Sequence, residues 1–358
     1  MQIIITSPSL DIKQNVSGIS SVTQFIIDNN SQNQYIHFEL GKKDKERGGI
    51  FRVKSIINSL FKWNKLLKDT PNAIIHYNFP LSKPSILRDP MFMYIARKRK
   101  MKMVVHIHGG NFLTASHTPR YLQWILKKTF ALPCPFIVLS DLEKQLVSEK
   151  YPCNKIQVLP NCVDLTEASQ YTKEIKESHE PLVMGYLGRI AETKGMGYLL
   201  EACKDLKKRN IPFILRIAGK EEIEHQYLPA FEKELGLQFI YDGVVSGKSK
   251  DEFLKSLDVF MLPSYFEGLP MSLLECMSFG VVPITTNVGS IGKVVTDNKN
   301  GIFIQVKDTT SIVEQFTHLH QNRTLLKNLS IEAKRTIIDQ FNPTAYINQL
   351  NLIYQSLT

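Results

Sequence analysis

Short apolar segments rich in β-branched residues alternate with longer helix-like segments along this chain of 358 residues. Strands buried on both faces of a parallel sheet have this pattern, and helices usually connect them. In the first half we predict a helix over residues 19–28 and strands over residues 2–6, 35–40, 73–77, 103–107 and 136–139. The pattern therefore predicts an α/β fold with a parallel sheet.

The alternation starts again at residue 182. We predict helices over residues 196–208, 250–256 and 271–279, and strands over residues 182–187, 213–218, 238–241, 259–262, 282–285 and 301–305. Residues 166–180 are polar and lack periodic apolar positions, as is typical of a linker. The chain is also too long for one ordinary core. We therefore predict two doubly wound, Rossmann-like domains, residues 1–165 and 181–342, joined by residues 166–180 and facing a central cleft.

The end of the chain has helical spacing, with Pro343 in the first turn. Its apolar positions are Tyr346, Ile347, Leu350, Ile353 and Leu357. We predict a C-terminal helix over residues 343–357, and we expect residues 343–358 to pack back on the first domain.

The net charge of +10 belongs to the first half of the chain. Residues 1–165 contain 23 Lys and Arg against 11 Asp and Glu, a net charge of +12, and the remainder carries −2. A basic half indicates an anionic partner, which could be a membrane, an acidic glycan or a nucleic acid. No nucleic-acid module is recognisable, so we expect no nucleic-acid partner.

Several features predict a cytoplasmic protein. No apolar run approaches the roughly 20 residues that span a bilayer. The opening residues lack the basic region of a signal peptide and predict a strand. The five cysteines form no Cys-x-x-Cys pair and have no metal-ligand spacing, as expected for free thiols in a reducing compartment.

The segment 262–280 has the clearest chemical pattern. A predicted strand ends at Leu262, a Gly-containing loop follows, and a helix begins at Pro270. The free N–H groups and the dipole of such a helix start attract an anion. Glu267 in the loop and Glu275 in the helix could bind the hydroxyls of a hexose and a ribose. Alternatively, Glu267 is a solvated loop residue and Glu275 a charge on the helix surface.

A second pattern follows the first strand of the second domain. Gly188-Arg189 and Lys194-Gly195 lie in one strand-to-helix turn, where two cations could bind a diphosphate. The spacing is not that of a Walker A loop. Arg and Lys in surface turns are usually only solvated, so this pattern alone does not indicate a binding site. Together with Glu267 and Glu275 downstream it does.

One histidine is a candidate for the reaction centre. His108 directly follows the predicted strand 103–107 and precedes Gly109 and Gly110, so its ring should emerge at the cleft. His106, two residues earlier, has the position of a structural histidine.

These residues together resemble glycosyltransferase family 4, whose members are GT-B enzymes that retain the anomeric configuration. The resemblance covers most of the second domain through the Gly-Arg, Lys-Gly and Glu-containing motifs. In the first domain it rests on Gly18, His108-Gly109-Gly110, Ser140 and Pro160-Asn161-x-Val163-Asp164.

The resemblance assigns roles to the matching positions. Arg189 and Lys194 would bind the donor diphosphate, Glu275 the ribose, and Gly18 would approach the diphosphate with its backbone. His108 would lie beside the donor hexose, and His108, Arg189, Lys194 and Glu267 form the implied catalytic set. The remaining donor contacts would come from Glu267, Gly268, Leu269, Pro270, Met271 and Ser272.

The resemblance implies a retaining glycosyltransferase that moves a hexose from a UDP- or GDP-sugar to a lipid-linked or glycan acceptor. The product would be a surface polysaccharide such as a capsule or O-antigen. Substitution would occur on one face of the sugar, and no Asp-x-Asp motif indicates a metal, so we expect no cofactor and no obligatory ion. Alternatives are a soluble small-molecule glycosyltransferase, a nucleotide-sugar epimerase, or a catalytically silent sugar-nucleotide-binding subunit.

The chain departs from the family pattern at three positions. The turn after strand 213–218 is reduced to Gly219-Lys220-Glu221, and the first loop lacks the common Gly-Gly pair. Lys293 stands where family members often have Glu. These departures leave the donor preference and the acceptor contacts open.

Residues 50–68 combine apolar residues with basic ones in the manner of an amphipathic membrane-surface helix. The candidate anchors are Phe51, Phe61 and Trp63, and the basic positions are Arg52, Lys54, Lys62, Lys65 and Lys68. We expect docking on an anionic membrane, at the inner face of the plasma membrane. The alternative is an ordinary helix that covers the sheet and has a solvated cationic face.

Overall fold

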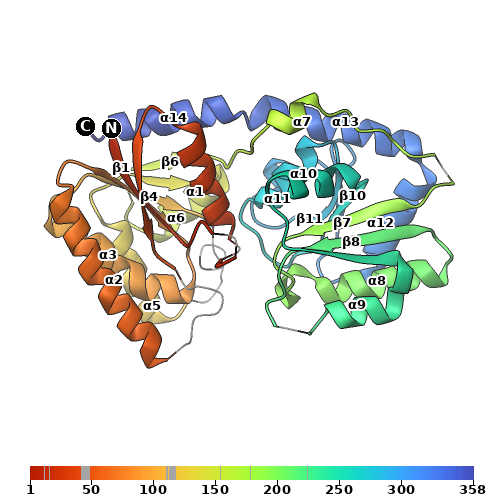
Figure 1. The fold of residues 1–358 in the computed structure, drawn as a ribbon, viewed down its shortest axis with the longest axis horizontal. Helices are drawn as coiled ribbons and strands as arrows, with labels where there is room; N and C mark the ends of the chain where they lie inside the picture. The colour runs from red at the N-terminus through yellow and green to blue at the C-terminus, as the bar shows by residue number, and fades with distance from the viewer. Residues whose placement is uncertain are drawn as a thin grey trace. The chain divides into compact units, whose positions relative to one another are not determined.

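The computed structural model describes residues 1–11, 13–15, 17–41, 49–109, 112, 118–153, 155–177, 179–223 and 225–358. The chain forms two compact units, each with a six-stranded parallel sheet and helices packed on it (Figure 1). Unit 1 contains Met1–Asn161 and Thr344–Thr358, and unit 2 contains Cys162–Pro343. The predicted fold class, with two doubly wound α/β domains, is confirmed.

The sheet of unit 1 has the strand order β2-β1-β3-β4-β5-β6. Its strands are β1 (Gln2–Ser7), β2 (Gln34–Glu39), β3 (Ile74–Phe79), β4 (Met103–Ile107), β5 (Phe136–Val138) and β6 (Ile156–Val158). Its helices are α1 (Gly18–Asn29), α2 (Ile50–Asp69), α3 (Lys83–Lys98), α5 (Arg120–Phe130), α6 (Asp141–Lys150) and α14 (Pro343–Gln355). The strands β3 and β4 are buried along their whole length, because helices cover both faces of a doubly wound sheet.

The last helix of the chain, α14, belongs to unit 1 although it follows unit 2 in sequence. The Asn351 Oδ1 atom accepts hydrogen bonds from the side-chain amides of Asn30 and Asn33, both at 2.8 Å. The Tyr354 hydroxyl lies 2.6 Å from Nδ1 of His76 on β3. These buried polar contacts fix the rotation of α14 about its axis, because Asn351 and Tyr354 each have a specific partner in the rest of unit 1.

The sheet of unit 2 has the strand order β12-β11-β10-β7-β8-β9. Its strands are β7 (Leu182–Leu187), β8 (Phe213–Ala218), β9 (Phe239–Gly243), β10 (Val259–Leu262), β11 (Val282–Thr286) and β12 (Ile302–Ile304). Its helices are α7 (Thr166–Gln170), α8 (Met196–Lys208), α9 (Leu228–Leu235), α10 (Gly247–Ser256), α11 (Met271–Ser278), α12 (Thr309–Gln321) and α13 (Arg323–Gln340). All six strands run parallel, but the order in which the chain adds them changes direction between β7 and β10, which is where ligands bind in such sheets.

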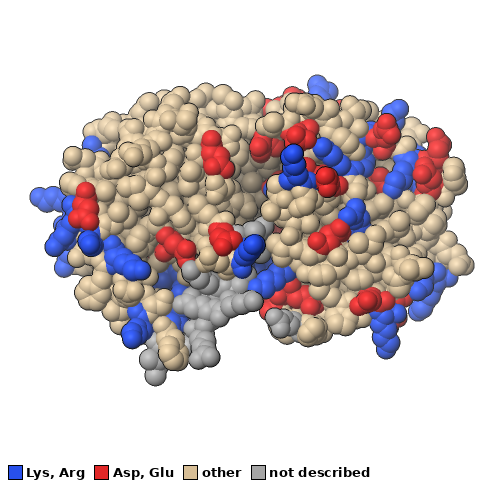
Figure 2. Space-filling view, viewed as in Figure 1, with Lys and Arg blue, Asp and Glu red and all other residues tan. Residues whose placement is uncertain are grey.

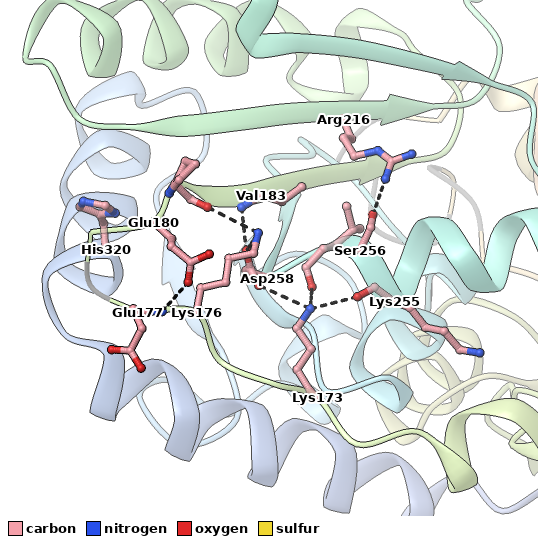
Figure 3. A network of polar contacts seen from close by, with 12 residues as sticks. Lys173, Lys176, Glu177, Glu180, Val183, Arg216, Lys255, Ser256, Asp258 and His320 are labelled. Atoms are coloured by element: carbon pink, nitrogen blue, oxygen red, sulfur yellow. Dashed lines mark hydrogen bonds and ion pairs between the residues drawn. The ribbon is translucent and has the colours of Figure 1, made fainter.

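The segment expected as a linker is fastened to unit 2 (Figure 3). It begins with α7, and beyond that helix Lys173 and Lys176 place their ammonium groups 3.4 and 3.0 Å from the carboxylate of Asp258. Asp258 is buried and also accepts a hydrogen bond from the Val183 N–H at 2.8 Å. The segment is thus attached to the buried carboxylate of Asp258 through two lysines, and detaching both would leave that carboxylate buried without a compensating charge.

One predicted membrane anchor is wrong, because Trp63 lies in the core of unit 1. Its side chain is fully buried, and its indole N–H donates to the Phe92 carbonyl at 3.0 Å. Apolar residues lie around most of the circumference of α2: Trp63 and Leu67 are buried, whereas Phe51 and Phe61 are 66% and 70% exposed. At about 100° per residue these two pairs point to different sides of the helix. The sequence did not show which of the two apolar sides packs against the sheet.

Replacing Trp63 with alanine is expected to lower the free energy of unfolding by about 3–5 kcal/mol, because the change opens a large cavity in a packed core. The chain has one other tryptophan, Trp124, which is 63% exposed. Trp124→Ala is the matched control, and it should change stability by less than about 0.5 kcal/mol. Chemical denaturation followed by circular dichroism compares the two variants. Equal effects would show that Trp63 is not a core residue.

Candidate functional site

The candidate donor site is built from two loops of unit 2, at the point where the strand order of the sheet changes direction. The loop after β7 runs over residues 188–195, and the loop after β10 runs over residues 263–270. The two strands pair directly, with Met184 opposite Val259 and Gly185 opposite Phe260. Parallel pairing brings the carboxyl ends of both strands, and hence both predicted motifs, to the same edge of the sheet.

Close backbone packing requires glycine at two positions of the site. Gly195 has a φ of +77°, and a Cβ there would lie 2.1 Å from the Pro263 carbonyl oxygen. Gly289 has a φ of +58°, and its Cβ would lie 1.9 Å from the carbonyl oxygen of Glu267. Any side chain would therefore push the loops apart. The departure from the family pattern in this region leaves Gly289, the glycine that supports the Glu267 loop, in place.

Lys194 and Glu267 form the centre of this arrangement. The Lys194 ammonium lies 2.6 Å from Glu267 Oε1, and the same oxygen accepts from the Ser264 hydroxyl at 2.7 Å. The Glu267 side chain is only 10% exposed and that of Lys194 is 26% exposed. Among the described residues no donor is recorded for Glu267 Oε2. The carboxylate is thus oriented by two partners on one oxygen, and its second oxygen can accept from a ligand hydroxyl.

Arg189 lies in the same loop as Lys194 but has different surroundings. Its guanidinium is half-exposed, 3.6 Å from the carboxylate of Glu222. The Arg189 carbonyl accepts a hydrogen bond from the buried Tyr186 hydroxyl at 2.6 Å, which fixes the backbone of the loop. An exposed pair of this length is weak. The guanidinium can therefore exchange Glu222 for an anionic ligand at little cost, whereas Lys194 is already held by a buried carboxylate.

The helix α11 supplies the third part of the site. Pro270 is its N-cap residue, and Met271 and Ser272 begin it, so their N–H groups have no partner within the helix. Leu269, just before it, is buried and anchors the loop. The chemistry of such a helix start favours an anion or a hydroxyl oxygen.

Glu275, in the second turn of α11, is paired with a lysine that sequence reasoning missed. Its Oε1 atom lies 2.8 Å from the Lys250 ammonium, and the Glu275 side chain is 15% exposed. The carboxylate raises the pKa of Lys250 above its usual value, although burial alone would lower it. Lys250 lies in α10, 25 positions away in sequence, and no local motif marks it. The structure therefore adds Lys250 to the candidate residues.

Two candidates lie in unit 1. Gly18 is the first residue of α1, and nothing lies within 4 Å of the position that a Cβ would take. His108 follows β4, is half-buried, and contacts the Asn78 side chain at 2.6 Å through Nε2. Gly109 has a φ of +69°, which requires a glycine there, whereas Gly110 lies outside the described residues.

His106 is fully buried, as expected for a structural histidine. Its Nδ1 atom lies 3.1 Å from His76 Nε2, but among the described residues no hydrogen bond is found for its Nε2 atom. Only one of the two ring nitrogens of His106 therefore has a hydrogen-bond partner there, which the sequence did not indicate. In the described part of the chain, no three His, Cys, Asp or Glu side chains are grouped so that they could hold a metal ion.

Comparison with known proteins agrees with this geometry. The model of the family "Glycosyl transferases group 1" matches residues 168–336, which contain both loops and α11. The WcaL protein of Salmonella typhimurium, named as a colanic acid biosynthesis glycosyltransferase, is 27% identical over 72% of this chain and 64% of its own length. The UDP-Gal:alpha-D-GlcNAc-diphosphoundecaprenol alpha-1,3-galactosyltransferase of Escherichia coli is 27% identical over 83% of this chain and 79% of its own. The match thus spans slightly less than two thirds of WcaL.

The solved structures extend the likeness to both units. HepE of Anabaena in complex with UDP-glucose superposes with a TM-score of 0.76, covering 99% of this chain and 100% of that one, at 14% sequence identity. At that identity the likeness concerns the fold, which is the GT-B fold. Residues 168–336 therefore carry the sequence pattern of the group 1 glycosyltransferases, and the chain has the GT-B fold.

Proposed function

We propose that this protein is a retaining glycosyltransferase that moves a hexose from a UDP- or GDP-sugar to an acceptor. The observation that carries the proposal is the Lys194–Glu267–Ser264 cluster, which joins the loop that also contains Arg189 to the loop that leads into α11. Two cations in one loop and the free N–H groups of a helix start suit a diphosphate. The cluster also holds a half-satisfied carboxylate that suits a sugar hydroxyl.

In this mechanism the acceptor oxygen attacks the anomeric carbon on the face from which the diphosphate leaves. The bond from the anomeric carbon to the diphosphate oxygen breaks, and that oxygen takes the proton of the acceptor hydroxyl. Arg189 and Lys194 stabilise the charge that develops on the diphosphate, which is the interaction that strengthens in the transition state. Glu267 orients the hexose, and Glu275 with Lys250 binds the ribose. His108 and Gly18 keep the roles that the family resemblance implies.

We further propose that the acceptor is lipid-linked and that the product is a surface polysaccharide. The names of both relatives support this, since one refers to colanic acid and the other to a diphosphoundecaprenol acceptor. The test is nucleotide release from UDP- and GDP-hexoses by the purified protein, with and without bacterial lipid extract. Release that requires the extract supports the proposal. Release with soluble acceptors alone indicates a small-molecule transferase, and no release with any donor indicates a silent sugar-nucleotide-binding subunit.

The two glutamates should be separable by calorimetric titration. Glu275→Ala is expected to weaken binding of free UDP or GDP about tenfold, because a hydrogen bond to a charged group contributes about 1.5–3 kcal/mol. Glu267→Ala should leave binding of the free nucleotide unchanged and weaken binding of the sugar nucleotide by a similar factor. Lys250→Ala should reproduce the effect of Glu275→Ala if the pair acts together. The opposite ranking of the two glutamates would reverse the assignment of ribose and hexose.

We propose that unit 1 holds the enzyme on an anionic membrane at the inner face of the plasma membrane. Three neighbouring helices, α2, α3 and α5, cover one face of the unit 1 sheet. Together they contain twelve Lys and Arg against two Asp, so their net charge equals that of the whole chain. Figure 2 shows Lys and Arg gathered at the edge of unit 1 where α2 and α3 run.

The same three helices also expose large apolar side chains. Each is between 42% and 70% exposed, and they are Phe51, Val53, Ile57, Phe61, Leu87, Met91, Tyr94, Tyr121 and Trp124. Aromatic and aliphatic residues among many cations suit the interface of an anionic bilayer. No helix in the described ranges is long and apolar enough to span a membrane. We name this surface of α2, α3 and α5 the three-helix face.

A further inference from the structure

We infer that unit 1 contains a pocket that binds a phosphate group, between α2, α3 and the end of β2. The pocket has a volume of about 300 Å³. The described residues that line it include Arg52, Ser55, Ile56 and Ser59 of α2, Arg88 of α3 and Glu39 of β2. All of them belong to unit 1, and none belongs to the candidate donor site, so the pocket is independent of the proposed function.

The inward row of α2 changes character halfway along the helix. Trp63 is fully buried in the core, as is normal for a row that faces a sheet. Counting back from it by four, three and four positions, the same side of the helix carries Ser59, Ile56 and Arg52. Burying polar groups without partners is unfavourable, so a row that becomes polar where a pocket begins indicates a binding role.

The two serines of the pocket have hydroxyl groups available for a ligand. Both are half-buried, and among the described residues no hydrogen bond is recorded for the side chain of Ser55 or Ser59. Helical hydroxyls often return to the carbonyl four residues earlier, as Thr129 of α5 does to Ile125 at 2.8 Å. Because neither serine makes such a bond, both can donate to a group inside the pocket.

Two arginines line the pocket from different helices. The Arg88 side chain is only 11% exposed, and its Nε atom is paired with the buried carboxylate of Asp89. Burial raises the pKa of Asp89 to about 6, and Arg88 and Arg52 both oppose that rise, so both guanidinium groups lie near one carboxylate. A guanidinium has five N–H groups, so Arg88 can keep Asp89 and still donate to an anion in the pocket.

This set of donors suits a phosphate group. Guanidinium groups and hydroxyls from two helices approach the pocket, and a phosphate has oxygens in several directions that can accept from all of them. A carboxylate has two oxygens in one plane and matches a single guanidinium. Glu39 is the only carboxylate among the described lining residues, and it is exposed, where solvent screens its repulsion.

Two sources carry the same chemical group. The helices α2 and α3 lie side by side and belong to the three-helix face, so a membrane lipid could supply the phosphate (Figure 1). A soluble phosphate ester could supply it as well. The pocket is therefore tested first with inorganic phosphate, and the source is then identified with vesicles.

Calorimetric titration with inorganic phosphate tests the pocket without any need for activity. The joint change Ser55→Ala and Ser59→Ala removes two donors at constant charge. Arg52→Lys keeps the charge but loses the planar fork of N–H groups. We expect each variant to weaken phosphate binding at least about tenfold, the effect of losing a hydrogen bond to a charged ligand. Arg120→Lys, at an exposed position of α5, is the matched control and should bind like the wild type.

The candidate donor site also attracts phosphate, so a second control separates the two sites. Lys194→Ala changes only unit 2 and should retain the phosphate binding that the α2 variants lose. If Lys194→Ala loses it and the α2 variants keep it, the phosphate binds in unit 2 and the pocket assignment is overturned. A wild type that binds no phosphate would overturn it too.

Flotation with two kinds of vesicle identifies the source. Phosphatidate presents a phosphate monoester, and vesicles with phosphatidylserine are matched to it in surface charge. A lipid ligand predicts that the wild type prefers phosphatidate and that the double serine variant loses this preference. Phosphate binding without any preference between vesicles supports a soluble ester in the same pocket. None of these measurements needs sugar transfer, so failure of the transferase proposal would leave them unaffected.

Discussion

Lys194→Ala is expected to lower kcat/KM for the sugar nucleotide more than tenfold. The ammonium would make a charge-assisted contact with the departing diphosphate, and removing such a contact costs about 1.5–3 kcal/mol. The variant also leaves the carboxylate of the Glu267 side chain, which is only 10% exposed, without its cation. Both effects act on the reacting centre, so Lys194→Ala should be more damaging than Arg189→Ala, which removes the contact to the ligand and only a weak, exposed pair with Glu222.

The matched control for this experiment is Lys204→Ala. Lys204 lies in α8 of the same unit and pairs with Glu201 at 3.0 Å, but it lies outside both loops of the site. Its loss should leave kcat/KM unchanged. Steady-state kinetics with the donor that supports transfer compares the variants. Near-normal rates for both Lys194→Ala and Arg189→Ala would mean that the diphosphate is bound elsewhere.

The second large effect concerns the three-helix face. Changing Lys54, Lys62, Lys65 and Lys68 together to serine should abolish most binding to vesicles that contain anionic lipid. All four side chains are exposed, and each cation near such a surface contributes about 1 kcal/mol. Binding of the wild type should weaken at high salt, where the Debye length shortens. Hydrolysis of the donor in solution should be almost unchanged, because the candidate donor site lies mainly in unit 2.

A matched charge control keeps this test specific. Lys207, Lys208, Lys233 and Lys299 are exposed lysines of unit 2, and their joint change to serine removes the same charge from the other unit. That variant should bind vesicles nearly as well as the wild type. Flotation of all three proteins with anionic and neutral vesicles gives the comparison. Equal flotation of the wild type and the α2 variant would exclude membrane docking through this helix and leave the transferase proposal intact.

The same flotation experiment can also test the apolar contribution to vesicle binding, with variants of the two tryptophans. Trp124→Ser, from the exposed surface of α5, should reduce vesicle binding without loss of structure, whereas Trp63→Ser should destabilise unit 1. The sequence alone predicts Trp63 as one of three anchors, with Phe51 and Phe61. The structure buries Trp63 and exposes Trp124, since packing against the sheet decides which tryptophan is buried.

The sequence by itself determined the two α/β units, because short apolar runs specify buried parallel strands wherever they occur. Strands such as β4, β7, β8 and β10 have the predicted bounds. It also located the two loops of the candidate donor site, since Gly, Pro and charged residues at strand ends are local signals. The strand β6 was missed because its three residues, Ile156–Val158, include a central glutamine and form only a brief pattern.

Only the tertiary structure decided the partners of the charged and polar side chains. Lys194 binds Glu267, Lys250 binds Glu275, and Asn78 faces His108, although these pairs are 73, 25 and 30 positions apart. No local pattern encodes such pairs, because they depend on which strand ends become neighbours in the sheet. The same reason explains Trp63: α2 carries apolar residues on more than one side, and only the packed neighbours determine which side is buried.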